Sequence, residues 1–143
     1  MPDVSVRTAE PDDANAIARV DALARDGSDR ARRVIRAIET GECLVACCAD
    51  RVAGYAVVNE CFFGRPFLEL IVVEEVSRRR GAGRALIRAV IDRFDGRTMF
   101  TSTNESNEAA QRLFEALGFV RSGVIDNLDP GDPELVYVWK PAG

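Results

Sequence analysis

The segment 67–86 constrains the fold more than any other part of the sequence. FLELIVVEE, at 67–75, is almost continuously apolar, as expected for a central strand covered on both faces. SRRRGAGRAL, at 77–86, then combines three arginines with two glycines and opens an amphipathic helix. The apolar face of that helix comprises Leu86, Ile87, Val90, Ile91 and Phe94. A strand that passes through glycines into a helix indicates an α/β unit.

The remaining patterns predict one mixed α/β (α+β) domain over residues 1–143. The expected strands are 4–9, 43–48, 52–63, 98–103, 120–128 and 135–139, with a turn at 49–51. The expected helices are 12–27, 28–41 and 107–117. Inward-facing positions in the last two are Val34, Ile35, Ile38, Ala109, Ala110, Leu113, Phe114 and Leu117.

Composition narrows the class of protein. The 143 residues carry a formal net charge of −4, which argues against a nucleic-acid partner because nucleic-acid-binding domains are usually basic. No apolar run approaches the roughly 20 residues of a membrane helix, and the N-terminal segment has no signal-peptide core. We therefore expect a cytoplasmic protein without a membrane partner.

The sequence contains no histidine, which excludes Ser-His-Asp and Cys-His catalysis. The four cysteines lack the spacing of a zinc site, so no metal is expected. Cys43, Cys47 and Cys48 lie in the apolar run CLVACC and are interpreted as small buried hydrophobic residues.

The two glycines of the arginine-rich segment suggest an anion site. Gly81 and Gly83 let backbone amides approach a ligand closely, and they precede a helix whose N-terminus attracts negative charge. Arg78, Arg79, Arg80 and Arg84 surround them. The segment lacks the Lys-Ser/Thr of a P-loop and the third glycine of a Rossmann fingerprint. The alternative interpretation is a tight turn with a solvated basic face.

VVEEVSRRRGAGRAL resembles motif A of the GNAT superfamily of N-acetyltransferases, through Arg78, Gly81 and Gly83. NEAAQRLFEALGF resembles the following motif B, through Asn107, Phe114 and the closing Gly118-Phe119. The resemblance implies a mainly antiparallel sheet of about six to seven strands flanked by about four helices, with a splayed central strand pair that binds CoA. It also implies N-acetyl transfer from acetyl-CoA, by direct attack of a primary amine on the thioester in a ternary complex.

The resemblance assigns the acetyl-CoA contacts residue by residue. The pyrophosphate would lie on the loop 78–84, the pantetheine arm would lie along the end of the strand before it, and Asn107 would contact that arm. The implied cofactor-binding residues are Ile71, Val72, Val73, Arg78, Arg79, Arg80, Gly81, Ala82, Gly83, Arg84, Asn107 and Phe114.

A base must remove a proton from the attacking amine. Glu69 is the one charged residue within FLELIVV, and strand alternation places it on the face of Phe67, Ile71 and Val73. A lone carboxylate there is costly to bury, which makes Glu69 the first candidate base and Glu60 on the neighbouring strand the second. The alternative is a structural glutamate whose charge is satisfied by a partner.

The candidate acid departs from the family pattern. Many members have a tyrosine at the position that matches Phe114, where its hydroxyl protonates the leaving thiolate. Phe114 has no proton to donate, and Tyr55 and Tyr137 are interpreted as packed aromatic residues. A thiol with a pKa near 8.5 is nevertheless a tolerable leaving group.

The acceptor is expected to be a small-molecule or peptide amine, and a homodimer is an alternative to a monomer. The acidic turn with Asp126, Asp129, Asp132 and Glu134 could attract a cationic amine or could be a solvated loop. Two other functions stay open: a CoA-binding module without turnover, and an acyltransferase with a longer acyl donor.

Overall fold

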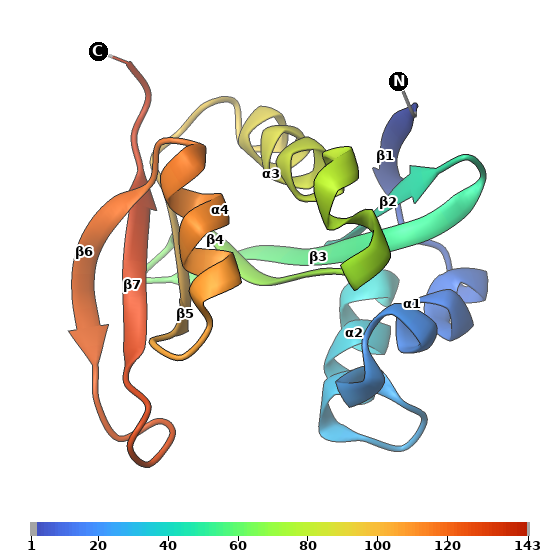
Figure 1. Ribbon diagram of the computed structural model, residues 1–143, viewed down its shortest axis with the longest axis horizontal. Coiled ribbons are helices and arrows are strands. Elements are labelled where there is room, and N and C mark those ends of the chain that lie inside the picture. Colours follow the sequence, from blue (N-terminus) through green and yellow to red (C-terminus); the bar gives the residue numbers. More distant parts are fainter. Residues whose placement is uncertain (1–2, 143) are drawn as a thin grey trace. The chain divides into compact units, whose positions relative to one another are not determined.

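The computed structural model describes residues 3–142, apart from the side chains of Arg79 and Arg80. Figure 1 labels its strands and its longer helices. The strands are β1 (Val4–Thr8), β2 (Cys43–Cys48), β3 (Arg51–Phe62), β4 (Arg65–Val73), β5 (Met99–Asn104), β6 (Val120–Ile125) and β7 (Glu134–Trp139). The α-helices are α1 (Ala14–Val20), α2 (Asp29–Glu39), α3 (Ala82–Arg93) and α4 (Glu108–Ala116). Three short 3₁₀ helices are η1 (Pro11–Asp13), η2 (Ala22–Ala24) and η3 (Glu75–Arg80).

The strands form one seven-stranded sheet in the order β1-β2-β3-β4-β5-β7-β6. The pairs β1–β2, β2–β3, β5–β7 and β6–β7 are antiparallel, whereas β4 and β5 are parallel, with Phe67 opposite Phe100 and Leu68 opposite Thr101. The sheet and the four α-helices confirm the mixed α/β architecture expected from the sequence. β4 is the middle strand of the sheet, as the run FLELIVV predicted.

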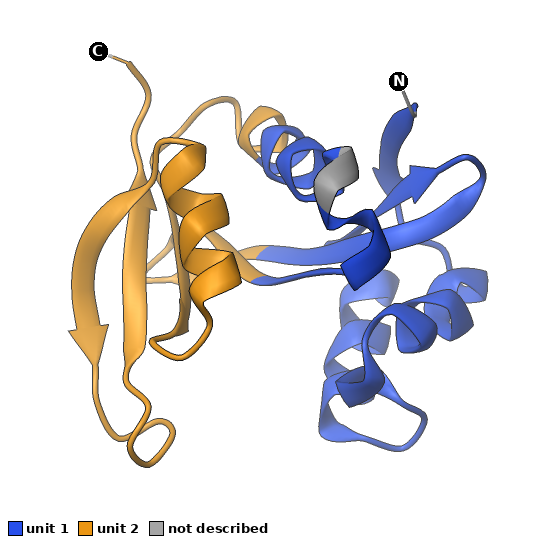
Figure 2. Ribbon diagram, in the orientation of Figure 1, with its two compact units in different colours: residues 1–58, 70–90 blue, residues 59–69, 91–143 orange. Residues whose placement is uncertain are grey.

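The chain groups into two compact units (Figure 2). Unit 1 comprises Met1–Val58 and Leu70–Val90, and unit 2 comprises Asn59–Glu69 and Ile91–Gly143. The division passes through β3 and β4, so each of these strands contributes one end to each unit. The two units are described separately below.

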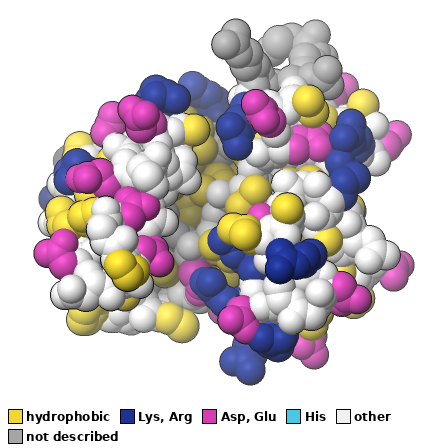
Figure 3. Space-filling view, turned by 60° about the horizontal axis from the view of Figure 1, so that its bottom comes forward, with side chains coloured by type: hydrophobic (Ala, Val, Ile, Leu, Met, Phe, Trp, Pro, Cys, Tyr) yellow, Lys and Arg dark blue, Asp and Glu magenta, His cyan; other side chains and the backbone are white. Residues whose placement is uncertain are grey.

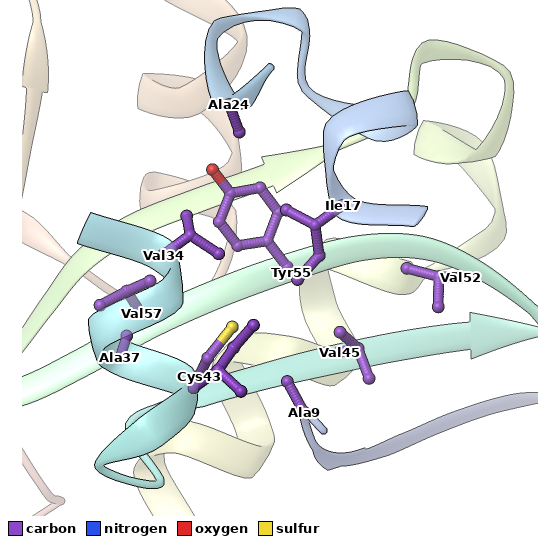
Figure 4. Close-up of a cluster of buried hydrophobic side chains, with 11 residues drawn as sticks. Ala9, Ile17, Ala24, Val34, Ala37, Cys43, Val45, Val52, Tyr55 and Val57 are labelled. Atoms are coloured by element: carbon purple, nitrogen blue, oxygen red, sulfur yellow. The ribbon is translucent and has the colours of Figure 1, made fainter. Parts of the chain in front are cut away.

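The core of unit 1 lies between the N-terminal helices and strands β2 and β3. Figure 4 shows the ring of Tyr55 among the side chains of Ile17 and Val34, with Cys43 and Val45 on the neighbouring strand. All five are at most 2% exposed. Leu70 and Val72, on the part of β4 that belongs to unit 1, pack against this cluster. The end of β4 is therefore anchored to a well-packed core.

The region between η1 and η2 differs from the single helix predicted over 12–27. α1 ends at Val20, and Asp21 adopts an extended conformation (φ −131°, ψ 102°) that interrupts the helix. The Asp21 carboxylate accepts hydrogen bonds from the backbone amide of Leu23, from Arg30 and from the hydroxyl of Tyr55. These contacts stabilise the break, because an aspartate that binds backbone and side-chain donors competes with helical hydrogen bonding.

Two predicted core positions are wrong. Ile35 is 46% exposed, because the buried face of α2 comprises Ala31, Val34, Ala37 and Ile38, and Ile35 lies about 100° further round the helix. Ala109 on α4 is also exposed, whereas Phe114 on the same helix is buried. The predicted cap of α2 is confirmed, since the side chain of Ser28 accepts a hydrogen bond of 3.0 Å from the amide of Ala31.

The cysteines are free thiols in different environments. Cys43 and Cys48 are buried, as predicted, whereas Cys47 is half-buried and Cys61 is exposed. Burial, with the nearby Asp13 carboxylate, raises the pKa of the Cys43 thiol to about 12. Cys43 is therefore a neutral packing residue at physiological pH.

The surface carries charges of both signs. On the face shown in Figure 3, arginine side chains alternate with aspartate and glutamate side chains. Over residues 3–142, none of the helices is both long and apolar enough to cross a membrane.

Candidate active site

The connection from β4 to α3 brings the motif A residues together in unit 1. β4 ends at Val73, and the chain then forms η3 over Glu75–Arg80 and reaches Gly81. Gly81 has left-handed backbone angles (φ 86°, ψ 13°), which a residue with a side chain rarely adopts. α3 begins at the next residue, and the amide of Ala85 donates to the carbonyl of Gly81. This glycine therefore performs the turn that the sequence predicted.

The start of α3 has the chemistry of an anion site. The first amides of an α-helix have no partner within the helix, and the helix dipole adds partial positive charge there. Ala82 and Gly83 are buried, so neither of them presents a side chain to solvent at this end of the helix. Arg78 and Arg84 are exposed and can bring positive charge to a ligand. The side chains of Arg79 and Arg80, which were also predicted to contribute, lie outside the described part of the chain.

Gly54 on β3 allows β4 to approach closely. A Cβ atom at Gly54 would lie 2.8 Å from the carbonyl oxygen of Val72 and 3.2 Å from Cγ2 of Val73. Contacts under 3.0 Å are essentially absent for real Cβ atoms, so only glycine fits here without a backbone shift. Val72 and Val73 are two of the residues predicted to face the pantetheine arm. Sequence reasoning missed Gly54, for which the available signal was a glycine inside an otherwise apolar strand.

Glu69 lies in unit 2 with a partner that the sequence analysis did not identify. Its Oε1 atom accepts a hydrogen bond of 2.8 Å from Nδ2 of Asn59 on β3. The Asn59 side chain is itself held in place, because its Oδ1 accepts a hydrogen bond of 2.9 Å from the amide of Cys61. Glu69 is half-buried and Asn59 is buried. The carboxylate of the first candidate base therefore has a fixed orientation.

Glu60 is in a more exposed environment. Its Oε1 lies 3.0 Å from Nη2 of Arg97, and both side chains are 51% exposed. Solvent-exposed ion pairs of this kind contribute little to stability. Glu60 remains the second candidate base.

The two motif B residues are at opposite ends of α4. Asn107 is the N-cap of the helix, and its Oδ1 accepts a hydrogen bond of 3.1 Å from the amide of Ala110. The Nδ2 group is the donor that Asn107 could offer to a ligand. Phe114 is 1% exposed, and its ring centroid lies 5.5 Å from those of Phe119 and Tyr137. Phe114 is thus a core residue of unit 2.

The two tyrosines make specific structural contacts. Tyr55 donates a hydrogen bond of 2.6 Å to Asp21, and burial together with that carboxylate raises the pKa of its hydroxyl. Tyr137 donates to Glu115 over 3.3 Å, and burial with the charge of Glu115 raises its pKa as well. Both tyrosines therefore stay protonated and packed at neutral pH.

The acidic residues near the turn after β6 are hydrogen-bonded to β5 and to the segment that follows it. Asn104 donates to Asp129 (2.8 Å), Ser106 donates to Asp132 through its amide and its hydroxyl, and Ser102 donates to Glu134 (2.7 Å). Asp126 is exposed. The contacts of the other three acids order the hairpin between β6 and β7. Within residues 3–142, no three cysteine or acidic side chains gather in a way that could hold a metal ion.

Comparison with known proteins identifies the family. The model of the acetyltransferase (GNAT) family matches residues 12–119, which is most of the chain. The chain belongs to this GNAT family. Its fold is also that of a GNAT acetyltransferase from Bacillus cereus, with a TM-score of 0.89, 33% identity and 99% coverage of both chains.

Two proteins from Salmonella typhimurium are also similar to this GNAT chain. The [ribosomal protein bS18]-alanine N-acetyltransferase is 33% identical over 84 residues, which is 57% of this chain. The structure of yncA with its cofactor acetyl-CoA has a TM-score of 0.75 at 22% identity, covering 97% of this chain and 94% of that one. The matches to curated relatives span only 26% and 56% of those proteins' own lengths.

Proposed function

We propose that this GNAT chain is an acetyl-CoA-dependent N-acetyltransferase. The observation that carries the proposal is the left-handed turn at Gly81, which connects the central strand β4 to the N-terminus of α3. In a chain that matches the GNAT family over residues 12–119, this turn provides the backbone anion site that a CoA pyrophosphate requires.

The residues of unit 1 fit the donor. Backbone amides of Ala82, Gly83 and Arg84 would hold the pyrophosphate, with the guanidinium groups of Arg78 and Arg84 beside it. The backbone of Ile71–Val73 would pair with the amides of the pantetheine arm. The similar yncA protein was solved with acetyl-CoA, which supports this choice of donor. The bound donor supplies an acetyl group activated as a thioester.

Glu69 is the group that we assign to proton removal. A neutral amine attacks the carbonyl carbon of the thioester, so that a C–N bond forms and the C–S bond breaks. The Glu69 carboxylate, oriented by Asn59, accepts the amine proton directly or through one water molecule. A backbone amide near Val72 or Val73 would stabilise the oxyanion. Since Phe114 cannot donate a proton, the sulfur leaves as a thiolate, which its pKa near 8.5 makes feasible.

The acceptor that the comparisons favour is the α-amino group of a peptide. The Salmonella enzyme that is 33% identical to this chain is named for acetylating an alanine of ribosomal protein bS18. An α-amino group has a pKa near 8, so a larger fraction is neutral at pH 7 than for a lysine side chain. Peptides that begin with alanine are therefore the first acceptors to test, followed by small amines.

Calorimetric titration with acetyl-CoA and CoA, followed by a free-thiol assay with peptides and amines, tests the proposal. We expect both ligands to bind and an α-amine to accelerate thiol release. Binding without acceleration by any amine would instead favour a CoA-binding module. Faster release from a longer acyl-CoA would favour a different acyl donor. Absence of binding would show that the turn at Gly81 serves only the fold.

A further inference from the structure

Glu74 lies between the two parts of the proposed donor site without belonging to either. It is the first residue after β4, following Val72 and Val73, and it precedes η3 and the loop 78–84. Its extended backbone (φ −62°, ψ 144°) is the point at which the chain leaves the strand. The position of Glu74 therefore affects both the strand end and the loop.

Among the side chains that the structure describes, three donate to the Glu74 carboxylate. Oε2 lies 2.9 Å from Nη1 of Arg19 and 3.0 Å from Nη2 of Arg51, and Oε1 accepts a hydrogen bond of 2.8 Å from the hydroxyl of Ser77. The Glu74 side chain is 11% exposed, although the two arginine side chains are 41% and 58% exposed. Charge-assisted hydrogen bonds to a shielded carboxylate are among the stronger polar contacts in proteins.

The backbone of Glu74 adds two further contacts. Its amide donates to the carbonyl of Ala53 on β3 over 2.8 Å, and its carbonyl accepts from the amide of Ser77 over 3.0 Å. Arg19 also donates to the carbonyl of Val52 over 2.6 Å. Glu74 thus ties α1, β3 and η3 together at the end of β4. Ser77 is 3% exposed and lies in η3 next to Arg78, so its hydrogen bonds to Glu74 also restrain this helix.

The carboxylate is ionised in this environment. Burial opposes ionisation, but the hydrogen bond from Ser77 and the two guanidinium groups outweigh burial and hold the pKa of Glu74 below its usual value. The negative charge of Glu74 faces Arg19 of α1 and Arg51 of β3.

We propose that Glu74 is a positioning residue for the donor, which fixes the geometry of the strand end and of the anion loop without touching acetyl-CoA. This inference rests on the proposed function. Losing the carboxylate would leave both arginines and Ser77 without their shared acceptor and would loosen η3. The predicted consequence is weaker donor binding, with little change in the chemical step once the donor is bound.

The test compares Glu74→Gln with Asp13→Asn in the full-length chain. Asp13 is a matched control, because its side chain is also 11% exposed and accepts hydrogen bonds of 2.7 and 2.9 Å from Arg7, but it lies on η1. We expect Glu74→Gln to raise the KM for acetyl-CoA and the calorimetric Kd for CoA about tenfold, with kcat within about twofold of wild type. Asp13→Asn should lower the Tm and leave the KM and Kd unchanged.

Two more variants separate positioning from folding. Glu74→Asp keeps the charge and should recover part of the donor affinity. Ser77→Ala removes one donor only and should raise the Kd for CoA by a smaller factor, which keeps the proposal testable if Glu74→Gln does not fold. The proposal is overturned if Glu74→Gln and Ser77→Ala lower the Tm while the KM and Kd stay at wild-type values. If wild-type protein binds neither acetyl-CoA nor CoA, the proposed function fails first, and this inference fails with it.

Discussion

The side-chain amide of Asn59 donates a 2.8 Å hydrogen bond to the carboxylate of Glu69. Asn59 and Glu69 come from neighbouring strands, and the asparagine is fixed in turn by the amide of Cys61. The arrangement orients one carboxylate oxygen and holds the acid on the middle strand of the sheet. In the proposed function, this hydrogen bond orients the carboxylate that accepts the amine proton; the alternative is a structural glutamate whose charge is satisfied by Asn59.

Replacing Glu69 by glutamine keeps the size of the side chain and its ability to accept a hydrogen bond from Asn59, but removes the basic carboxylate. We expect kcat to fall about a hundredfold or more, because general bases contribute rate factors of this order. The Kd for CoA should be unchanged. Glu60→Gln replaces the second candidate base, which lies in an exposed ion pair with Arg97, and should keep wild-type kcat if Glu69 is the base. Equal losses of kcat in the two variants would show that Glu69 is not the base.

Gly54→Ala should destabilise the protein by about 1–3 kcal/mol, since the new Cβ would meet the backbone oxygen of Val72 at 2.8 Å and force the strands apart. The same shift should weaken CoA binding. Gly123→Ala is a suitable control because Gly123 also lies in a strand, and an added Cβ there would meet nothing within 4 Å. Urea unfolding and calorimetric titration measure the two effects. Identical stability of the two variants would show that β3 and β4 adjust freely.

Gly81→Ala should lower the free energy of unfolding by about 1–2 kcal/mol, because an alanine is strained in the left-handed conformation. Gly27→Ala should have a similar cost, since Gly27 has a φ of 81° and equally open surroundings. Only Gly81→Ala should also weaken CoA binding, because only Gly81 shapes the start of α3. Thermal unfolding and CoA titration of both variants check this. A similar loss of affinity in Gly27→Ala would mean that affinity follows stability alone.

The stability of the protein should fall in acid through Asp13. The hydrogen bonds from Arg7 outweigh the burial of Asp13, and with the amide of Glu10 they hold the pKa of Asp13 below its usual value. A carboxyl group whose pKa is lower in the folded state stabilises the fold above the unfolded-state pKa, and this contribution is lost as pH falls through the folded-state pKa. Tm measured from pH 7 to pH 2 should therefore decrease below about pH 4.

Asp13→Asn and Arg7→Gln should each flatten this acid dependence, and the double variant should flatten it no further, because both substitutions remove the same pair. Additive effects on the pH dependence would contradict the assignment to this pair.

The sequence predicted the elements around the site well, because each has a strong local signal. The two glycines before an amphipathic helix indicated the start of α3, and glycine tolerates the left-handed conformation that Gly81 adopts. The apolar run of β4 likewise requires a central position in the sheet. The helix over 107–117 was predicted from its apolar pattern and its closing glycine, and its start at Asn107 is confirmed by a side-chain cap.

Contacts between distant residues could not be predicted in the same way. The break at Asp21 depends on Arg30 and Tyr55, which are 9 and 34 residues further along the chain. In the sequence, Glu74 is the first of two consecutive glutamates after an apolar run, and nothing local marks it as important. Its contacts with Arg19 and Arg51 arise only from the fold. Asn59 could not be identified from the sequence either, because its hydrogen bond to Glu69 depends on how β3 and β4 align.

Mass spectrometry of an acceptor peptide tests the central claim most directly. A peptide that begins with alanine is incubated with acetyl-CoA and the purified protein, and the site of any acetyl group is located by fragmentation. The account predicts one acetyl group on the α-amine with wild-type protein and far less with Glu69→Gln. An unmodified peptide, and unmodified amines across the panel, from a protein that binds acetyl-CoA would contradict it.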